Sequence, residues 1–239
     1  MSKAFSFLRY LGDLFLDFIF PPHCLICGYL GDWFCDTCRQ QLTKDPVYDC
    51  LVCVGQQHQD AICDACQVTS GLAGVVIACN YDRLIQRVIH SFKYKDARVL
   101  QFALTEVFWQ VFVQSSLARL SPEQLIIFPV PLHPHKQTQR GYNQCELLAR
   151  QLIERLPGSY LGQGLIRQLD TSSQMQLTRQ ERLYNLEGAF AYTGQSLAGR
   201  TVVLLDDVCT TGSTLLECSR ALLPAQPDQI WGLVLAHGR

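Results

Sequence analysis

Two adjacent carboxylates precede a hydroxyl-rich segment in the last fifth of the chain. Asp206 and Asp207 follow the apolar run 202–205, and the segment after them consists of Val208, Cys209, Thr210, Thr211, Gly212, Ser213 and Thr214. Backbone N–H groups and hydroxyls at the start of a helix are typical of a phosphate site. Carboxylates would repel the same anion, so they suit sugar hydroxyls or a Mg²⁺ ion beside it. The pattern predicts a site for one ligand that carries both a phosphate and a diol.

The alternative is an ordinary strand-to-helix turn with a capping residue. Such a turn needs only one Asp, Ser or Thr, whereas seven of the nine positions from Asp206 are acids, hydroxyl residues or glycine. The run 202–205 predicts a strand buried on both faces, and residues 215–223 have the apolar pattern of a helix. Ligands of α/β proteins bind at the carboxyl ends of such strands. The sequence therefore predicts an α/β fold with this site at the edge of a parallel sheet.

This segment resembles the phosphoribosyl pyrophosphate (PRPP) motif of type I phosphoribosyltransferases. The resemblance implies a parallel sheet flanked by helices, with a hood over the site. It also implies that Asp206 and Asp207, the candidate catalytic residues, hold the ribose 2′- and 3′-hydroxyls, and that residues 208–214 bind PRPP with the 5′-phosphate against residues 210–214. Mg²⁺ is expected to bind together with PRPP.

Eight of the twelve cysteines form four C-x-x-C pairs before residue 67. Two such pairs supply the four thiolates of a tetrahedral zinc site, whereas disulfides are rare in a reducing cytosol and no secretory signal is evident. Neighbouring pairs predict two structural Zn²⁺ ions, although a cross-braced arrangement of first with third and second with fourth is the alternative. The expected ligands are Cys24, Cys27, Cys35 and Cys38 for one ion, and Cys50, Cys53, Cys63 and Cys66 for the other.

The length of 239 residues and the apolar fraction of 48% allow one full domain and a small one. The net charge of −1 shows no overall excess of positive charge of the kind that indicates nucleic-acid binding. Residues 1–22 have one apolar helical face, and the run is too short and too charged to span a bilayer. We expect an amphipathic helix that docks on the main domain, with a membrane-surface helix as the alternative. The predicted domains are this helix over 1–22, a double zinc ribbon over 23–68 and a phosphoribosyltransferase-like domain over 69–239.

Basic residues before the acid pair are candidates for binding pyrophosphate. A buried strand over 125–132 leads into a polar loop over 133–139, and a helix is expected over 140–155. By position, Lys136 and Arg140 are the pyrophosphate candidates. The long polar stretch 167–185 is expected to be a lid, in which Arg167, Arg179 and Arg182 are the candidate cations.

The remaining pattern predicts further elements of the α/β domain: strands over 74–81, 160–166, 186–192 and 229–236, and helices over 82–91 and 99–120. Residues 92–95 (Phe-Lys-Tyr-Lys) alternate aromatic and basic side chains after the helix over 82–91. That alternation is typical of a solvated strand, so it is a weak indication of function.

The order of six motifs resembles the ComF family of the ComFC/GntX type. They are the four C-x-x-C pairs, Phe-Lys-Tyr at 92–94, Pro-Val-Pro-Leu-His at 129–133, Arg-Gly-Tyr-Asn-Gln at 140–144, the spaced pattern from Arg167 to Phe190, and Asp-Asp-Val-x-Thr-Thr-Gly-x-Thr at 206–214. The resemblance implies a cytoplasmic protein that handles incoming single-stranded DNA during natural transformation, with other competence or recombination proteins as partners. One difference is that the loop 133–139 has fewer arginines than the family usually shows.

Three functional classes follow from these features. The first is a phosphoribosyltransferase with an unknown acceptor, because no residue stands out as a general base or as a reader of a nucleobase. The second is a non-catalytic PRPP or nucleotide sensor. The third is a module that binds single-stranded DNA or a partner, for which exposed aromatic side chains would be needed; the candidates are Trp33, Phe34, Phe92, Tyr94 and Tyr142. A nucleotide pocket and a role in DNA uptake are compatible.

Overall fold

The computed structural model of the chain describes most of its residues. The exceptions are residues 1–20, 22, 25, 33, 43–47, 54, 56, 59–61, 95–96, 170–185 and 239. The helix predicted over 1–22, most of the predicted lid and the candidates Arg179 and Arg182 therefore lie outside the described residues. Among the helices in the described ranges, none combines the length and the apolar character needed to cross a membrane.

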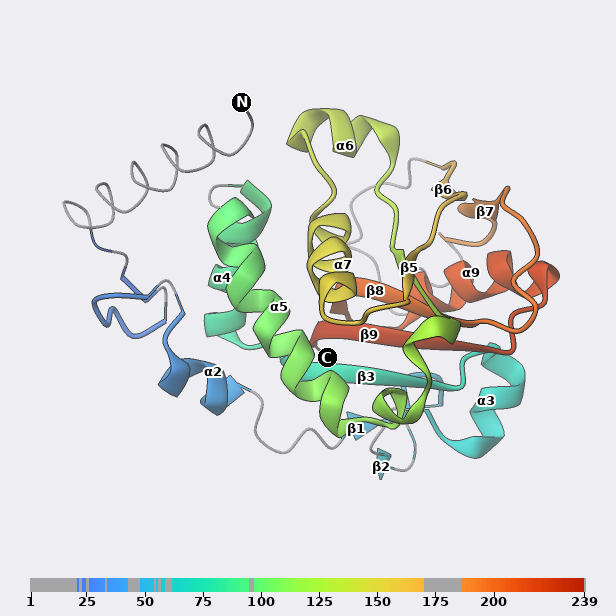
Figure 1. The fold of residues 1–239 in the computed structure, drawn as a ribbon, viewed down its shortest axis with the longest axis horizontal. Coiled ribbons are helices and arrows are strands. Elements are labelled where there is room, and N and C mark those ends of the chain that lie inside the picture. The colour runs from blue at the N-terminus through green and yellow to red at the C-terminus, as the bar shows by residue number, and fades with distance from the viewer. Residues whose placement is uncertain are drawn as a thin grey trace.

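A five-stranded sheet forms the centre of the molecule (Figure 1). Its strands stand in the order β3 (Gly74–Asn80), β9 (Gln229–His237), β8 (Thr201–Cys209), β4 (Leu125–Pro129) and β5 (Tyr160–Leu161), and all neighbours are parallel. The central strands are almost continuously apolar because both faces of a parallel sheet are covered. The predicted α/β fold with a helix-flanked parallel sheet is confirmed.

Alternate residues of β8 face two different cores. Val203 and Leu205 belong to one core, whereas Val202 and Leu204 belong to the other, as the two-residue period of a strand requires. The first core is covered by α4 (Arg83–Tyr94), α5 (Ala97–Gln114) and α7 (Gln144–Glu154), and the second by α3 (Asp64–Ser70) and α9 (Ser213–Leu222). This layering brings α4 and α7 to the carboxyl ends of the central strands (Figure 1), and α9 begins there because it starts at Ser213, just after β8 ends at Cys209.

Several elements differ from the sequence expectation. Strand β8 continues through the acid pair to Cys209, and the predicted polar loop 133–139 is largely a helix, α6 (Pro134–Arg140). The strand expected over 160–166 is divided into β5 and β6 (Leu165–Arg167), because Gly164 between them takes a left-handed conformation with φ +89°. Strand β6 pairs antiparallel with β7 (Phe190–Tyr192), which forms a two-stranded sheet apart from the main one.

Short helices and strands complete the described chain. The cysteine-rich part contains α2 (Asp36–Leu42) and the antiparallel pair β1 (Tyr48–Asp49) and β2 (Gln57–His58). The 3₁₀ helices are η1 (Ser116–Arg119), η2 (Pro122–Gln124) and η4 (Leu223–Ala225). The cysteine-rich part packs on the main sheet: Cys24, Cys35 and Cys38 join the first core, whereas Cys50 and Cys66 join the second.

The close packing of Phe128 on Gly162 supplies a test of the sheet edge. A Cβ added at Gly162 would lie 2.4 Å from Cγ of Phe128, whose ring also packs edge-on against Tyr192 of β7. Gly162→Ala must displace this ring, so we expect a loss of about 1–3 kcal/mol in the free energy of unfolding, measured by urea denaturation. The same change in a Phe128→Leu background should cost less, because the smaller side chain leaves room; an equal cost in both backgrounds would contradict this packing.

Candidate functional site

The acid pair lies buried at the carboxyl end of β8, where Asp206 and Asp207 are only 8% and 4% exposed. Oδ2 of Asp207 accepts a hydrogen bond from Nε2 of Gln144 at 2.9 Å and lies 2.8 Å from Nζ of Lys93. Oδ1 of Asp206 accepts the backbone N–H of Asp207 at 2.8 Å and the thiol of Cys145 at 3.7 Å. Helices α4 and α7 thus supply the side chains that hold the acids.

Burial and mutual repulsion set the charge state of this pair. Burial, and then the charge of Asp207, raises the pKa of Asp206 to about 7, although the N–H of Asp207 and the charge of Lys93 act in the opposite direction. Burial lowers the pKa of Lys93, but the attraction of Asp207 outweighs it, so the pKa of Lys93 is raised overall. Lys93 is therefore a stable cation beside the acids, and Asp206 can take up or release a proton near neutral pH.

The Arg-Gly-Tyr-Asn-Gln motif at 140–144 positions these groups. The Tyr142 hydroxyl donates to the carbonyl of Phe92 at 2.7 Å, which ties the segment just before α7 to the last turn of α4 next to Lys93. Asn143 caps α7 by accepting the N–H of Cys145 at 2.9 Å, and its side-chain amide donates to the carbonyl of Val130 at 3.0 Å. Because Gln144 follows directly, the motif fixes the position of its amide on Asp207.

The hydroxyl-rich segment forms a tight turn between β8 and α9. The hydroxyls of Thr211 and Ser213 lie 2.5 Å apart, and Gly212 has a left-handed conformation with φ +75° that favours glycine. A Cβ added at Gly212 would lie 3.6 Å from Cβ of Leu51, which sits inside the third C-x-x-C pair. The hairpin of the second cysteine cluster therefore packs directly against this turn.

A cavity of about 490 Å³ opens beside the acid pair, and it brings together residues from distant parts of the chain. Its described lining includes four cationic side chains, Lys93, Lys136, Arg140 and Arg167, against the two acids. The other lining residues are Tyr81, Val130, Pro131, Leu132, Gln144, Cys145, Val208, Thr210 and Thr214. The excess of two cations and the adjoining hydroxyls suit an anionic, hydroxyl-bearing ligand.

The structure places the sequence candidates as follows. Lys136, Arg140 and Arg167 line the same cavity as the acids. Of the segment 208–214, Val208, Thr210 and Thr214 line the cavity, whereas Cys209 is buried in the second core and residues 211–213 form the turn.

Lys93 is the functional candidate that the sequence reasoning missed. The alternation at 92–95 is only a weak indication of function in the sequence, but the apolar spacing of α4 continues from Ile85, Val88 and Ile89 to Phe92, so the helix extends to Tyr94. Extending that spacing by one turn would have predicted the helix and placed Lys93 beside the sheet edge.

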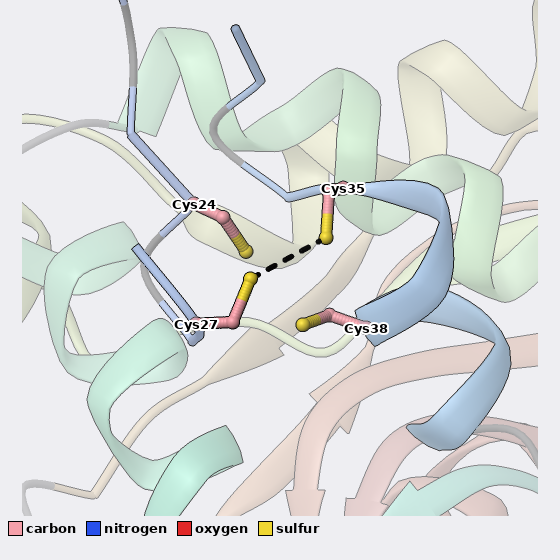
Figure 2. Close-up of side chains that lie close together, drawn as sticks. All are labelled: Cys24, Cys27, Cys35 and Cys38. Carbon is pink, nitrogen blue, oxygen red and sulfur yellow. Dashed lines mark hydrogen bonds between the residues drawn. The ribbon is translucent and has the colours of Figure 1, made fainter. Parts of the chain in front are cut away.

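The two cysteine clusters have the neighbouring arrangement of C-x-x-C pairs. Sulfur atoms of Cys24, Cys27, Cys35 and Cys38 all lie within 4.8 Å of one another, and so do those of Cys50, Cys53, Cys63 and Cys66. Figure 2 shows the four side chains of the first cluster pointing toward a common centre. The turn that carries Cys24 and Cys27 is closed by a hydrogen bond from the N–H of Gly28 to the carbonyl of Cys24 at 2.8 Å.

The sulfur geometry fits zinc. A tetrahedron with Zn–S bonds of about 2.3 Å has edges of about 3.8 Å, and the distances from Cys27 to Cys35 and from Cys53 to Cys63 are 3.6 Å and 3.8 Å. Burial raises the pKa of Cys50, but backbone N–H groups, led by that of Cys53, outweigh it and lower the pKa to about 6. Each cluster could therefore hold a metal ion, and the second has a thiolate ready at neutral pH.

These features define an α/β protein with a parallel sheet, a polar cavity at its carboxyl edge and two four-cysteine clusters. No family model matches the chain. It is 29% identical over 219 residues to Competence protein F of Haemophilus influenzae, which covers 90% of this chain and 85% of the relative. It is also 28% identical over 198 residues to Competence protein ComFC of Bacillus subtilis, an alignment that covers 79% of this chain and 77% of the relative. A third relative, DNA utilization protein YhgH of Escherichia coli K12, is 27% identical over 223 residues, which cover 89% of this chain and 96% of the relative. These relatives confirm the similarity to the ComF family.

The cysteine geometry predicts two zinc ions per chain. We expect elemental analysis of the purified protein to give two equivalents, and Cys53→Ser and Cys27→Ser each to lose about one and to lower the thermal midpoint. Cys79→Ala and Cys218→Ala are matched controls, because these buried cysteines lie outside both clusters. A wild-type content near zero would contradict metal binding, and full retention in the Ser variants would contradict the assigned ligands.

The raised pKa of Asp206 predicts how stability depends on pH. Its ordinary value is 3.8, so between about pH 4 and pH 7 the folded state binds more protons than the unfolded state, and the free energy of unfolding falls as pH rises. We expect Asp206→Asn to remove this fall, on the order of a few kcal/mol, in urea titrations from pH 5 to pH 8 at constant zinc.

Asp228→Asn is the control for that titration, because Asp228 is exposed just before β9, at the amino ends of the strands and away from the acid pair. Thiol protonation contributes equally to both proteins, so the difference between them isolates Asp206. Parallel pH curves for wild type and Asp206→Asn would contradict a raised pKa.

Proposed function

We propose that the cavity binds PRPP or a related ribose phosphate and that the protein acts in handling incoming DNA. The observation that carries the first part is the meeting of the acid pair, four cations and two threonines of the hydroxyl-rich segment, Thr210 and Thr214, around one cavity. A ligand with a diol next to phosphate groups needs this combination, because the acids accept from hydroxyls while the cations and the turn bind the phosphates.

The acid pair suits sugar hydroxyls better than a directly bound metal ion. Lys93 already neutralises Asp207 at 2.8 Å, so a Mg²⁺ ion on that carboxylate would meet a neighbouring cation. Ribose hydroxyls carry no charge and can donate hydrogen bonds to acids that remain paired with Lys93 and Gln144. Any Mg²⁺ is expected to reach the site on the phosphates of the ligand.

In this proposal the cations of the cavity bind the phosphates of the ligand. Lys136 lies within α6 and Arg140 is the last residue of that helix, whereas Arg167 is the last residue of β6. These cations therefore reach the cavity from two sides. Cations that surround a pyrophosphate would stabilise the charge that grows on it if the glycosidic bond breaks. The same set would also serve a sensor that binds the ligand without reaction, and release of pyrophosphate separates these two alternatives.

The DNA-handling part rests on the relatives, whose names are competence proteins and DNA utilization proteins. We propose a role in natural transformation or DNA utilization for this chain, with single-stranded DNA and other competence or recombination proteins as its partners. The ribose-phosphate cavity and the DNA role are independent enough to be tested separately.

The ribose-phosphate proposal is tested with the acid pair. Asp206→Asn with Asp207→Asn keeps side-chain size and removes both acceptor charges, so we expect PRPP affinity to fall about a hundredfold or more in calorimetric titrations with Mg²⁺. Asp228→Asn is the control, and it should bind as wild type does. Equal PRPP affinity of wild type and the double variant would contradict the role of the acids. Absence of PRPP binding to folded, zinc-loaded wild type would reject the ligand.

A further inference from the structure

Helix α4 presents a basic and aromatic face away from the first core. Ile85, Val88, Ile89 and Phe92 are buried on one side of the helix. The opposite side carries four exposed residues at spacings of four, three and four, which fall within a narrow arc of the helix. We call these residues the α4 strip: Arg83, Arg87, His90 and Tyr94. The strip spans about 16 Å along the helix axis.

The strip leads to the mouth of the ribose-phosphate cavity. The guanidinium of Arg140 lies over the Tyr94 ring, 5.2 Å from its centroid, and Nη2 of Arg140 donates to the Tyr94 hydroxyl at 3.5 Å. Arg140 and Lys136, one turn earlier on α6, both line the cavity. Positive charge therefore continues from α4 through α6 into the cavity.

No acidic side chain within α4 or α6 offsets the positive charge along the strip and α6. Residues 83–94 and 134–140 contain no Asp or Glu. The nearest acid along the chain, Asp82, caps α4 by accepting the N–H groups of Leu84 at 2.8 Å and Ile85 at 2.9 Å. This concentration of positive charge contrasts with the net charge of −1 for the whole chain.

An aromatic ring stands at the end of the strip nearest the cavity. Tyr94 is 63% exposed although His90 and Arg140 flank it, with the ring centroids of His90 and Tyr94 5.0 Å apart. Two arginines on a helix face that ends at an exposed ring match a single strand of nucleic acid, which offers phosphates at intervals and bases free to stack. In a duplex the bases are already stacked on each other, so the ring would add nothing.

We propose that the α4 strip is the binding surface for single-stranded DNA, with Arg83 and Arg87 on the phosphates and Tyr94 stacked on a base. The proposal rests on the DNA-handling part of the proposed function. It places the strand beside the cavity, so that its backbone passes Arg140 and Lys136 at the cavity mouth.

The test is titration of the zinc-loaded full chain with a fluorescent oligo-dT at several salt concentrations. Arg83→Gln with Arg87→Gln should weaken binding and make the slope of log K against log salt shallower by about 1.4, since each phosphate contact to a single strand contributes about 0.7. Tyr94→Ala should weaken binding roughly tenfold, whereas Tyr94→Phe keeps the ring and should stay near wild type.

The matched control is the arginine–tyrosine pair beside β5, in which Tyr160 is exposed and Arg200 is partly buried. Arg200 lies over the ring of Tyr160 on β5, 5.4 Å from its centroid, so Arg200→Gln with Tyr160→Ala removes the same chemistry elsewhere. This control should bind oligo-dT as wild type does. The variant Arg83→Gln with Arg87→Gln should retain PRPP affinity, because neither residue lines the cavity.

Two results would overturn the inference, and they are distinguishable. If wild type binds oligo-dT but the α4 variants bind it with unchanged affinity and salt slope, the DNA surface lies elsewhere and the DNA-handling proposal stands. If wild type fails to bind oligo-dT at low salt, both direct DNA binding and the assignment of the α4 strip as its surface are rejected. Equal affinity for a duplex of the same length would contradict the stacking role of Tyr94.

Discussion

The contact of Lys93 and Gln144 with Asp207 is the interaction on which the site depends. Two adjacent carboxylates buried at one strand end would be costly without partners. Lys93 supplies a charge, Gln144 a hydrogen bond, and the backbone N–H of Asp207 holds Asp206. The helices that carry the first two are joined by the bond from Tyr142 to Phe92. The positions of α4 and α7 and the electrostatics of the acids are therefore set by one network.

The cysteine clusters are integrated with the sheet instead of standing apart from it. The first packs with the core beneath α4, α5 and α7, and the second packs with the core beneath α9. Leu51, between Cys50 and Cys53 of the second cluster, lies so close to the hydroxyl-rich turn that a Cβ added at Gly212 would be 3.6 Å from its own Cβ. A metal that fixes this hairpin would also fix one wall of the turn, which gives a structural zinc ion a direct connection to the proposed phosphate site.

The sequence predicted the features whose signals are local. Buried strands appear as apolar runs, and C-x-x-C spacing predicted both cysteine clusters. The acid pair and the cations Lys136, Arg140 and Arg167 were predicted individually, and the fold brings them to one cavity. Contacts between distant segments have no local signal: Lys93 and Asp207 are 114 positions apart, and Tyr142 reaches back to Phe92. Helix α6 was missed because its residues after Pro134 are all polar and lack the apolar period that indicates a helix.

The most direct test of a ribose-phosphate cavity is a crystal structure of the zinc-loaded protein with ribose 5-phosphate or PRPP and Mg²⁺. The account predicts ribose hydroxyls within hydrogen-bonding distance of Asp206 and Asp207, the 5′-phosphate against residues 210–214, and Lys93 still on Asp207. A ligand bound elsewhere, or a phosphate on Arg140 with the ribose turned away from the acids, would contradict it. So would an empty cavity at ligand concentrations that saturate binding in solution.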